Sequence, residues 1–189
     1  TLKDENLGHD DKPSLPGTFE ILCQLIVPCA TLRDALTLGT RYYGLFDMAL
    51  HTQFHLNDEG GELVMNERRP CLNKHHYITE FQLVLWHRLC CWLTGKRIPI
   101  KMAEFAYARP KHADEFRLFF YGDNQFNMPK TLIRIEKQYL DLPIIRTRSD
   151  LPELMKEAPY VFLVKPNNTA SINAQIRRIL EISAESEMP

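Results

Sequence analysis

The stretch from His76 to Tyr107 constrains the fold of this chain more than any other. Its first part, HYITEFQLVLWHRLCCWLTG, spaces large apolar residues three or four positions apart, as one face of a helix does: Ile78, Phe81, Leu85, Leu89 and Trp92. We expect polar residues on the opposite face: Thr79, Glu80, His87 and Thr94. Gly95 predicts the end of this helix. The next residues, IPIKMAEFAY, favour a half-buried strand, and a helix followed at once by a strand predicts a domain core.

The overall composition is typical of a soluble globular protein. The chain has 189 residues, of which 44% are hydrophobic and 25% are charged, and its net charge is −1. This balance gives the chain, taken whole, no electrostatic reason to bind nucleic acid. It contains no apolar run long enough to cross a membrane and no basic-then-apolar leader, so we expect a cytoplasmic protein without membrane contact.

Cysteine usage agrees with that expectation. The five cysteines form no C-x-x-C pair, so neither a zinc site nor a disulfide framework is indicated. The adjacent Cys90 and Cys91 fall on the central helix, where small apolar thiols are common. A redox-sensing role for this pair is an alternative, but buried thiols are mostly inert.

Local signals predict the remaining elements. Phe19 to Pro28 favours a helix, and Thr31 with Asp34 three residues later predicts the capped start of another, LRDALTLGTRYYGLF, which buries one side at Leu32, Ala35, Leu36, Gly39 and Tyr43. Residues 50–66 alternate around the turn Asn57–Gly61, which predicts a β-hairpin. Later segments predict a short helix in KHADEFRLFF that buries Phe116, Phe119 and Phe120, a strand at 130–135, and one or two helical turns from Ser149 to Glu157.

Together these elements predict an α+β fold, a small, largely antiparallel mixed sheet covered by helices. We divide the chain into a tail or loop at 1–18, a main domain at 19–164, a linker at 165–170 and a separate amphipathic helix within 171–189. That last helix is too small to be stable alone and needs a partner. Because the chain has no initiator methionine, we expect it to be a fragment of a longer protein.

A ligand pocket between the central helix and the sheet is one hypothesis for the polar and aromatic residues of this core. Gln82 interrupts the apolar stripe, and a buried amide needs a hydrogen-bond partner, which a neighbouring backbone group or a ligand could provide. The candidate lining residues are Gln82, Trp86, Phe105, Tyr107 and Tyr43, with Arg41 or Arg109 at the mouth to bind an acidic group. The simpler interpretation is that the aromatic residues pack the core and the arginines form surface ion pairs.

No motif indicates catalysis or metal binding. The sequence lacks G-x-S-x-G, a P-loop and G-x-G-x-x-G, and we expect no enzyme activity. An enzyme would need a titratable couple such as His87 with Glu80, which we expect to be solvated. His51 and His55 share a strand face, but no third ligand has a matching spacing, so we interpret them as a solvent-facing pair rather than a metal site.

The chain resembles the N-terminal effector domain of AraC-type transcriptional regulators, in the branch labelled arabinose-binding. The resemblance runs from about Gly17 to Leu180. It rests on TLRDAL followed by RYYGLF, on the hairpin at 50–66, and on two long segments, HRLCCWLTGKRIPIKMAEFAYARPKHADEFRLFF and TLIRIEKQYLDLPII. SINAQIRRIL resembles the first helix of the DNA-binding domain that follows the sensor in this family, so the truncated helix-turn-helix domain would start at 171.

The resemblance implies a homodimeric cytoplasmic sensor of a small-molecule effector. We expect no cofactor. The resemblance places DNA binding in a C-terminal domain that we expect to be missing from this chain, together with part of the sensor before Thr1. The label "arabinose-binding" does not identify the effector, because members of this branch respond to diverse metabolites. Two alternatives remain open: a domain that only self-associates, and an enzyme that modifies a small molecule.

Overall fold

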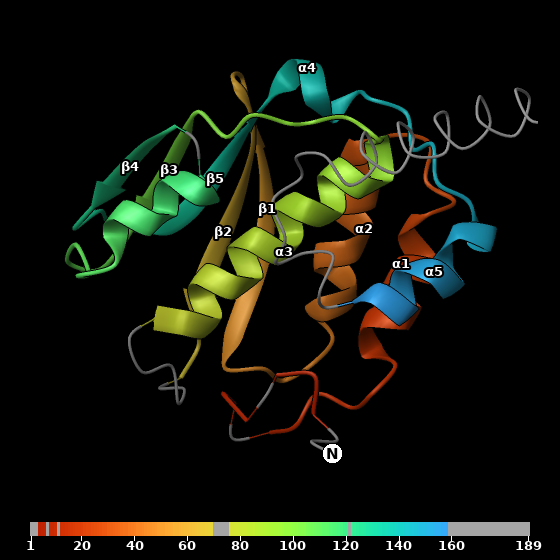
Figure 1. Ribbon diagram of the computed structural model, residues 1–189, viewed down its shortest axis with the longest axis horizontal. Coiled ribbons are helices and arrows are strands. Elements are labelled where there is room, and N and C mark those ends of the chain that lie inside the picture. Colours follow the sequence, from red (N-terminus) through yellow and green to blue (C-terminus); the bar gives the residue numbers. More distant parts are fainter. Residues whose placement is uncertain (1–3, 7, 11, 70–75, 121, 159–189) are drawn as a thin grey trace, which may run out of the picture.

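A five-stranded mixed sheet forms the centre of the fold (Figure 1). The computed structural model describes residues 4–6, 8–10, 12–69, 76–120 and 122–158. The strand order is β1–β2–β5–β3–β4, and the strands are β1 (Leu50–Asn57), β2 (Gly60–Glu67), β3 (Met102–Phe105), β4 (Asp123–Phe126) and β5 (Thr131–Glu136). Neighbouring strands pair antiparallel, except β3 and β4, which are parallel. The predicted α+β class with a largely antiparallel mixed sheet is confirmed.

The β1–β2 hairpin forms as predicted, because Asn57 and Gly60 have the side chain and the backbone freedom that its turn requires. The Asn57 side-chain oxygen accepts the backbone N–H groups of Glu59 and Gly60, at 3.0 and 2.9 Å. Gly60 has φ +152°, which L side chains rarely adopt, and a Cβ there would lie 2.2 Å from the carbonyl oxygen of Ile135. A glycine at this position therefore lets β2 pair closely with β5.

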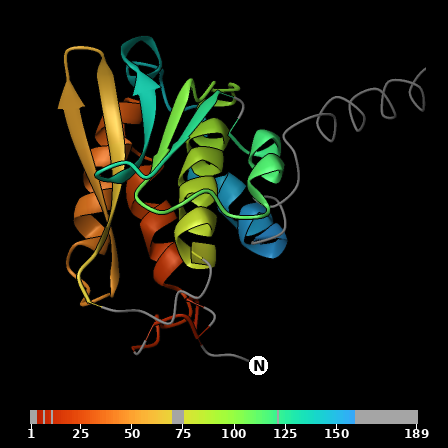
Figure 2. The ribbon, with the colours of Figure 1, turned by 90° about the vertical axis from the view of Figure 1, so that its left-hand side faces the viewer.

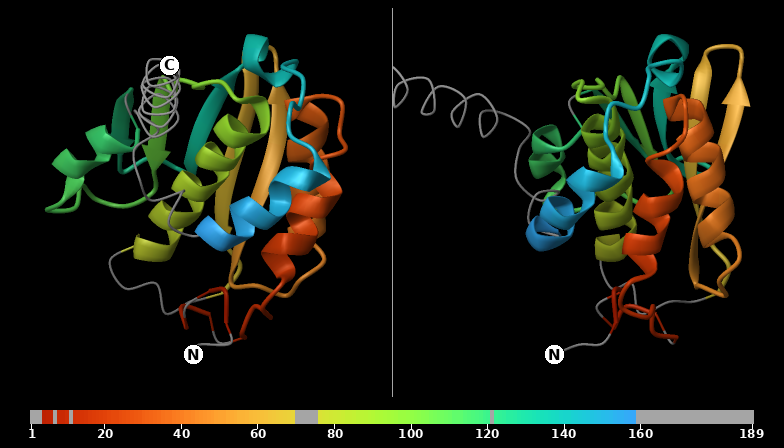
Figure 3. Two further views of the ribbon diagram at one scale, coloured as in Figure 1. Left: turned by 45° about the vertical axis from the view of Figure 1, so that its right-hand side comes forward. Right: turned by 90° about the vertical axis from the view of Figure 1, so that its right-hand side faces the viewer.

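The helices cover one face of the sheet. They are α1 (Thr18–Ile26), α2 (Leu32–Tyr43), α3 (Tyr77–Thr94), α4 (Lys137–Leu140) and α5 (Leu151–Glu157), with 3-10 turns η2 (Ala113–Leu118) and η3 (Arg148–Asp150). Helix α3 lies across the sheet face, and α1 and α5 lie beside it on the same side (Figures 1 and 2). Helix α2 lies alongside the edge strand β1 (Figure 3).

The predicted helix boundaries are mostly confirmed. The Thr31 hydroxyl accepts the N–H of Asp34 at 3.2 Å and caps α2. Gly95 ends α3 in the left-handed conformation, with φ +62°. α1 forms where a helix was favoured, and η3 with α5 fills the predicted helical stretch from Ser149 to Glu157.

Three details of the sequence prediction are wrong. Helix α3 has no polar face, because Thr79, His87 and Thr94 are buried, whereas Phe81, Leu85 and Trp92 are only half-buried. The reason is that the sheet, the loop after Gly95 and other helices surround α3, so burial does not follow one stripe. Strand β3 is shorter than predicted: residues 98–100 precede it and contribute buried side chains but no strand. Finally, Phe119 is half-buried, unlike Phe116 and Phe120.

The segment before α1 is a loop held by carboxylates. Glu5 accepts the N–H groups of Gly17 and Phe19, at 2.7 and 2.9 Å, at the start of α1. Asp10 accepts the N–H of Ala49 at 2.6 Å and pairs with Arg69 at 3.1 Å. These contacts fasten the loop to α1 and to the base of the hairpin. The predicted linker and the amphipathic helix, at 165–170 and 171–189, lie outside the described residues.

Candidate functional site

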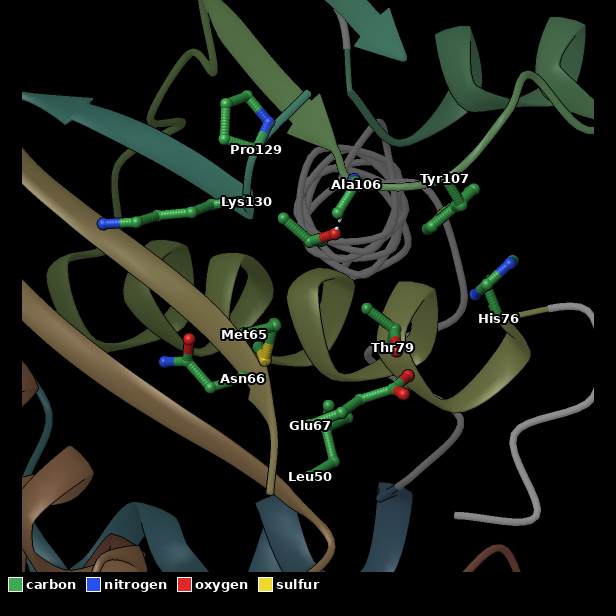
Figure 4. Close-up of a pocket in the computed structure, with 11 residues that line it drawn as sticks. Leu50, Met65, Asn66, Glu67, His76, Thr79, Ala106, Tyr107, Pro129 and Lys130 are labelled. Carbon is green, nitrogen blue, oxygen red and sulfur yellow. Dashed lines mark hydrogen bonds between the residues drawn. The ribbon is translucent and has the colours of Figure 1, made fainter. Parts of the chain in front are cut away.

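A pocket of about 310 Å³ opens at the lower end of the sheet, where three strand ends meet the first turn of α3 (Figure 4). The end of β2, the residues after β3, the residues before β5 and the start of α3 form its wall. The residues that line it are Leu50, Met65, Asn66, Glu67, His76, Thr79, Ala106, Tyr107, Pro129, Lys130 and Thr131. Its volume is at the lower end of the range for sites that bind small organic molecules.

A hydrogen-bond network fixes one wall of the pocket. The Tyr107 hydroxyl donates to Glu80 Oε1 at 2.9 Å, and the same carboxylate lies 3.1 Å from Nε2 of His112. The ring of His76 stacks on Tyr107 with 3.7 Å between centroids and an interplanar angle of 1°. Burial and, secondarily, the Glu80 charge raise the pKa of Tyr107, so the phenol stays protonated and donates a hydrogen bond to Glu80.

A second hydrogen bond joins the two strand ends beside this wall. The Thr131 hydroxyl, which is buried, accepts the N–H of Ala106 at 2.9 Å, the dashed line in Figure 4. It satisfies a backbone donor where the β3–β5 pairing has ended. The pocket is therefore lined by fixed polar groups as well as by the apolar side chains of Leu50 and Met65.

Of the seven residues predicted to bind a ligand, Tyr107 lines this pocket. Trp86 and Phe105 instead fill the core, with 2% and 0% of their surface exposed. The indole Nε1–H of Trp86 donates to the Thr52 hydroxyl at 3.0 Å, and Tyr43 packs edge-on against Trp86 with 6.0 Å between centroids. The structure thus brings Trp86 and Tyr43 together, away from the wall that Tyr107 forms.

The other three predicted residues lie apart from one another. Gln82 lines a separate hollow of about 10 Å³, which has room for little more than one water molecule. Arg41 is exposed on α2. Arg109 is also exposed, pairs with Asp114 at 2.8 Å and lies over the ring of Phe126. Ligand binding by these residues stays a prediction, and the arrangement shows that they do not line one common pocket.

The proposed enzymatic couple of His87 and Glu80 does not form. His87 is 1% exposed, and its Nε2–H donates to the carbonyl oxygen of Ile98 at 2.7 Å, while Glu80 binds Tyr107 and His112. Burial lowers the pKa of His87 to about 4. The expectation that both side chains are solvated is wrong for His87, which ties α3 to the loop after Gly95.

The histidines of the hairpin are not a matched pair. His51 is 7% exposed, because the end of α2 near Gly44 covers it, whereas His55 is exposed. The interpretation of both as solvent-facing is wrong for His51. Among the residues that the structure describes, no group of three or more His, Cys, Asp or Glu side chains could hold a metal ion.

Cys23, Cys29, Cys90 and Cys91 are free thiols, and Cys71 lies outside the described residues. Burial raises the pKa of Cys90 well above its usual value and that of Cys91 as well, so both remain protonated thiols rather than reactive thiolates. Within the described part of the chain, no helix is long and apolar enough to cross a membrane.

Sequence reasoning missed most of the pocket, including Glu67, Thr79 and Lys130. One signal could have indicated them: polar residues occur where the predicted hairpin arm ends and where the predicted strand at 130–135 begins. Ends of neighbouring strands meet at one edge of a sheet, so such residues gather there. The prediction instead used the aromatic residues in the middle of the elements, which pack the core.

Comparison with known proteins identifies the family. Residues 1–144 match the family described as the arabinose-binding domain at the N-terminus of AraC transcription regulators. The chain belongs to this family. It is also similar to the Ornithine utilization regulator of Pseudomonas aeruginosa, with 21% identity over 160 residues, which cover 85% of this chain and 47% of that protein. This AraC-type regulatory domain therefore spans about half the length of that relative.

Proposed function

We propose that this domain binds a small-molecule effector in the pocket at the lower end of the sheet and dimerises as part of a cytoplasmic AraC-type transcription regulator. The pocket itself carries the proposal, because it is the place where several elements meet around an accessible cavity with fixed polar groups. The family supports the regulatory role. In the intact regulator, we assign DNA binding to a different domain.

The position of the pocket suggests how an effector would act. Its wall joins the first turn of α3 to the ends of β2, β3 and β5, so a bound molecule would contact elements that are far apart in the sequence. An effector changes a regulator only by binding one arrangement of these elements more tightly than another. Ligand contacts at this junction would therefore bias the position of α3 relative to the sheet.

Thermal unfolding with a panel of amino acids, sugars, aromatic acids and fatty acids tests the proposal. The name of the Pseudomonas relative makes amino acids, L-ornithine included, the first compounds to try. An effector at a hundred times its dissociation constant should stabilise the domain by about 2.7 kcal/mol. For a domain of this size, that corresponds to a rise in Tm of roughly 5–10 °C.

A matched pair of variants locates the site. Ala106 and Ala108 are both exposed, but the pocket is lined by Ala106 and not by Ala108. Ala106→Phe should fill the pocket and abolish the shift, whereas Ala108→Phe should retain it. A shift that survives Ala106→Phe in a folded variant would place the effector elsewhere.

Self-association without any ligand is the second candidate function. The observation that favours it is the close packing around Trp86 and Phe105, which are buried in the apolar core between helix and sheet. Sedimentation analysis over a range of concentrations tests the dimer that both functions need. A stable dimer with no thermal shift in the whole panel would support self-association alone, and a monomer at all concentrations would refute dimerisation by this domain.

A further inference from the structure

We propose that the pocket binds a small aliphatic amine, with its ammonium group between the Glu67 carboxylate and the Thr79 hydroxyl. This inference rests on the proposal that the pocket is the effector site, and it adds the chemical class of the effector. The argument uses the charge of the lining side chains, their direction, and the shape of the apolar wall.

Glu67 supplies the negative charge inside the pocket. It is the last residue of β2, and its carboxylate points toward Thr79 on the first turn of α3 (Figure 4). Among the described residues that line the pocket, it is the one carboxylate. A carboxylate opposite a hydroxyl offers an ammonium group a charge-assisted hydrogen bond and a neutral one, and such bonds are the stronger class of polar contact.

Glu80 supplies a second negative charge, behind the part of the pocket wall that Tyr107 forms. Glu80 accepts a hydrogen bond from the Tyr107 hydroxyl at 2.9 Å, so the phenol oxygen can present only acceptor lone pairs to the pocket. The Glu80 side chain is 16% exposed, so water screens its charge less than at an open surface. Next to Thr79, Glu67 with Glu80 behind it favours a cation over an anion.

The apolar part of the wall suits a short hydrocarbon chain. Leu50 and Met65 line the pocket beside Glu67, and its volume of about 310 Å³ admits a small organic molecule. The positively charged Lys130 lies at the rim, is exposed and forms no ion pair with the described residues; its side chain extends away from Thr79 in Figure 4. An amino acid would direct its carboxylate toward Lys130. A diamine has no carboxylate and would not use Lys130.

Three probes of equal length test the charge preference. Binding of 1-aminopentane, 1-pentanol and pentanoate would be measured by calorimetry and thermal unfolding at pH 7, where the amine is a cation and pentanoate is an anion. We expect 1-aminopentane to bind at least tenfold more tightly than either of the others. L-Lysine and 1,5-diaminopentane then distinguish the two sources of an amine, because only the amino acid carries a carboxylate for Lys130.

Substitutions test the two contacts. Glu67→Gln should weaken binding of the tightest amine roughly 10- to 100-fold, the loss expected for a hydrogen bond to a charged group. The matched control is Glu59→Gln in the turn at the opposite end of the hairpin, and it should leave binding unchanged. Thr79→Val should weaken binding, whereas Thr79→Ser, which keeps the hydroxyl, should restore it.

The outcomes separate this inference from the broader proposal. Equal binding of pentanol or pentanoate, or amine binding that is insensitive to Glu67→Gln, overturns the amine inference. If a compound that is not an amine stabilises the domain and Ala106→Phe abolishes its effect, the sensor proposal stands and the amine inference is refuted. If neither amines nor any other compound in the panel binds, both are refuted.

Discussion

The buried hydrogen bond between Trp86 and Thr52 allows a quantitative test of the core. The Trp86 indole N–H donates to the Thr52 hydroxyl at 3.0 Å, and this hydroxyl donates in turn to the sulfur of Met65 at 3.2 Å. Trp86 and Thr52 are 2% and 6% exposed, so water cannot replace a lost partner. Thr52→Val keeps the shape of the side chain and removes the acceptor, which leaves a buried N–H unsatisfied.

The expected cost of Thr52→Val is about 1–3 kcal/mol, the penalty for one unsatisfied buried donor. The contact to Met65 adds little, because a thioether is a weak acceptor. For a domain of this size, the Tm should fall by roughly 2–12 °C. Urea unfolding followed by circular dichroism measures the change in free energy. Thr37→Val on the exposed side of α2 is the matched control and should change stability by less than about 0.5 kcal/mol.

A double-mutant cycle with Trp86→Phe isolates the hydrogen bond from the packing of the indole ring. After Thr52→Val, removal of the indole N–H no longer breaks a bond, so Trp86→Phe should cost less than it does in the parent by about 1–3 kcal/mol. A coupling energy within about 0.5 kcal/mol of zero would refute the reasoning, because two residues in contact would then behave as independent sites.

Three further perturbations follow from single contacts. Burial lowers the pKa of His87 from 6.5 to about 4, so between these pH values the folded state binds fewer protons than the unfolded state. Urea unfolding at several pH values should show full stability above pH 6.5 and a loss of up to about 3 kcal/mol as the pH falls toward 4. His87→Gln should remove this pH dependence. Gly122→Ala should destabilise the domain by roughly 2–3 kcal/mol in the same assay, because its Cβ would lie 2.2 Å from the carbonyl oxygen of Lys101; an unchanged stability would contradict this close approach. Thr31→Ala should lower the unfolding free energy by about 1 kcal/mol through loss of the α2 cap to Asp34, while Thr31→Ser should be nearly neutral.

Features that depend on a few consecutive residues could be predicted from the sequence. The Thr31 cap, the Gly95 helix end and the turn at Asn57–Gly61 all appear where predicted. Each is determined by the backbone preference or hydrogen-bonding capacity of one side chain, so neighbouring elements have little influence on it. The α+β class follows from the order of such elements.

Features that depend on surroundings could not be predicted in the same way. The helical pattern places His87 with other polar residues on a solvent-facing side of α3, but in the structure its Nε2–H donates to the carbonyl of Ile98 inside the protein. The pocket combines residues from five separate parts of the chain, and no spacing in the sequence relates Glu67 to Thr79 or Ala106. Only the meeting of strand ends with the start of α3 defines it.

The central place of β5 has a consequence for how this protein folds. β5 pairs with β2 on one side and β3 on the other, although both precede it by long stretches of chain. As the chain leaves the ribosome, the hairpin can form early, but β2 and β3 keep one open edge each until residues 131–136 emerge. Non-local pairing of this kind slows folding and leaves edges available to other chains. The period before β5 docks is therefore when aggregation competes most strongly with folding.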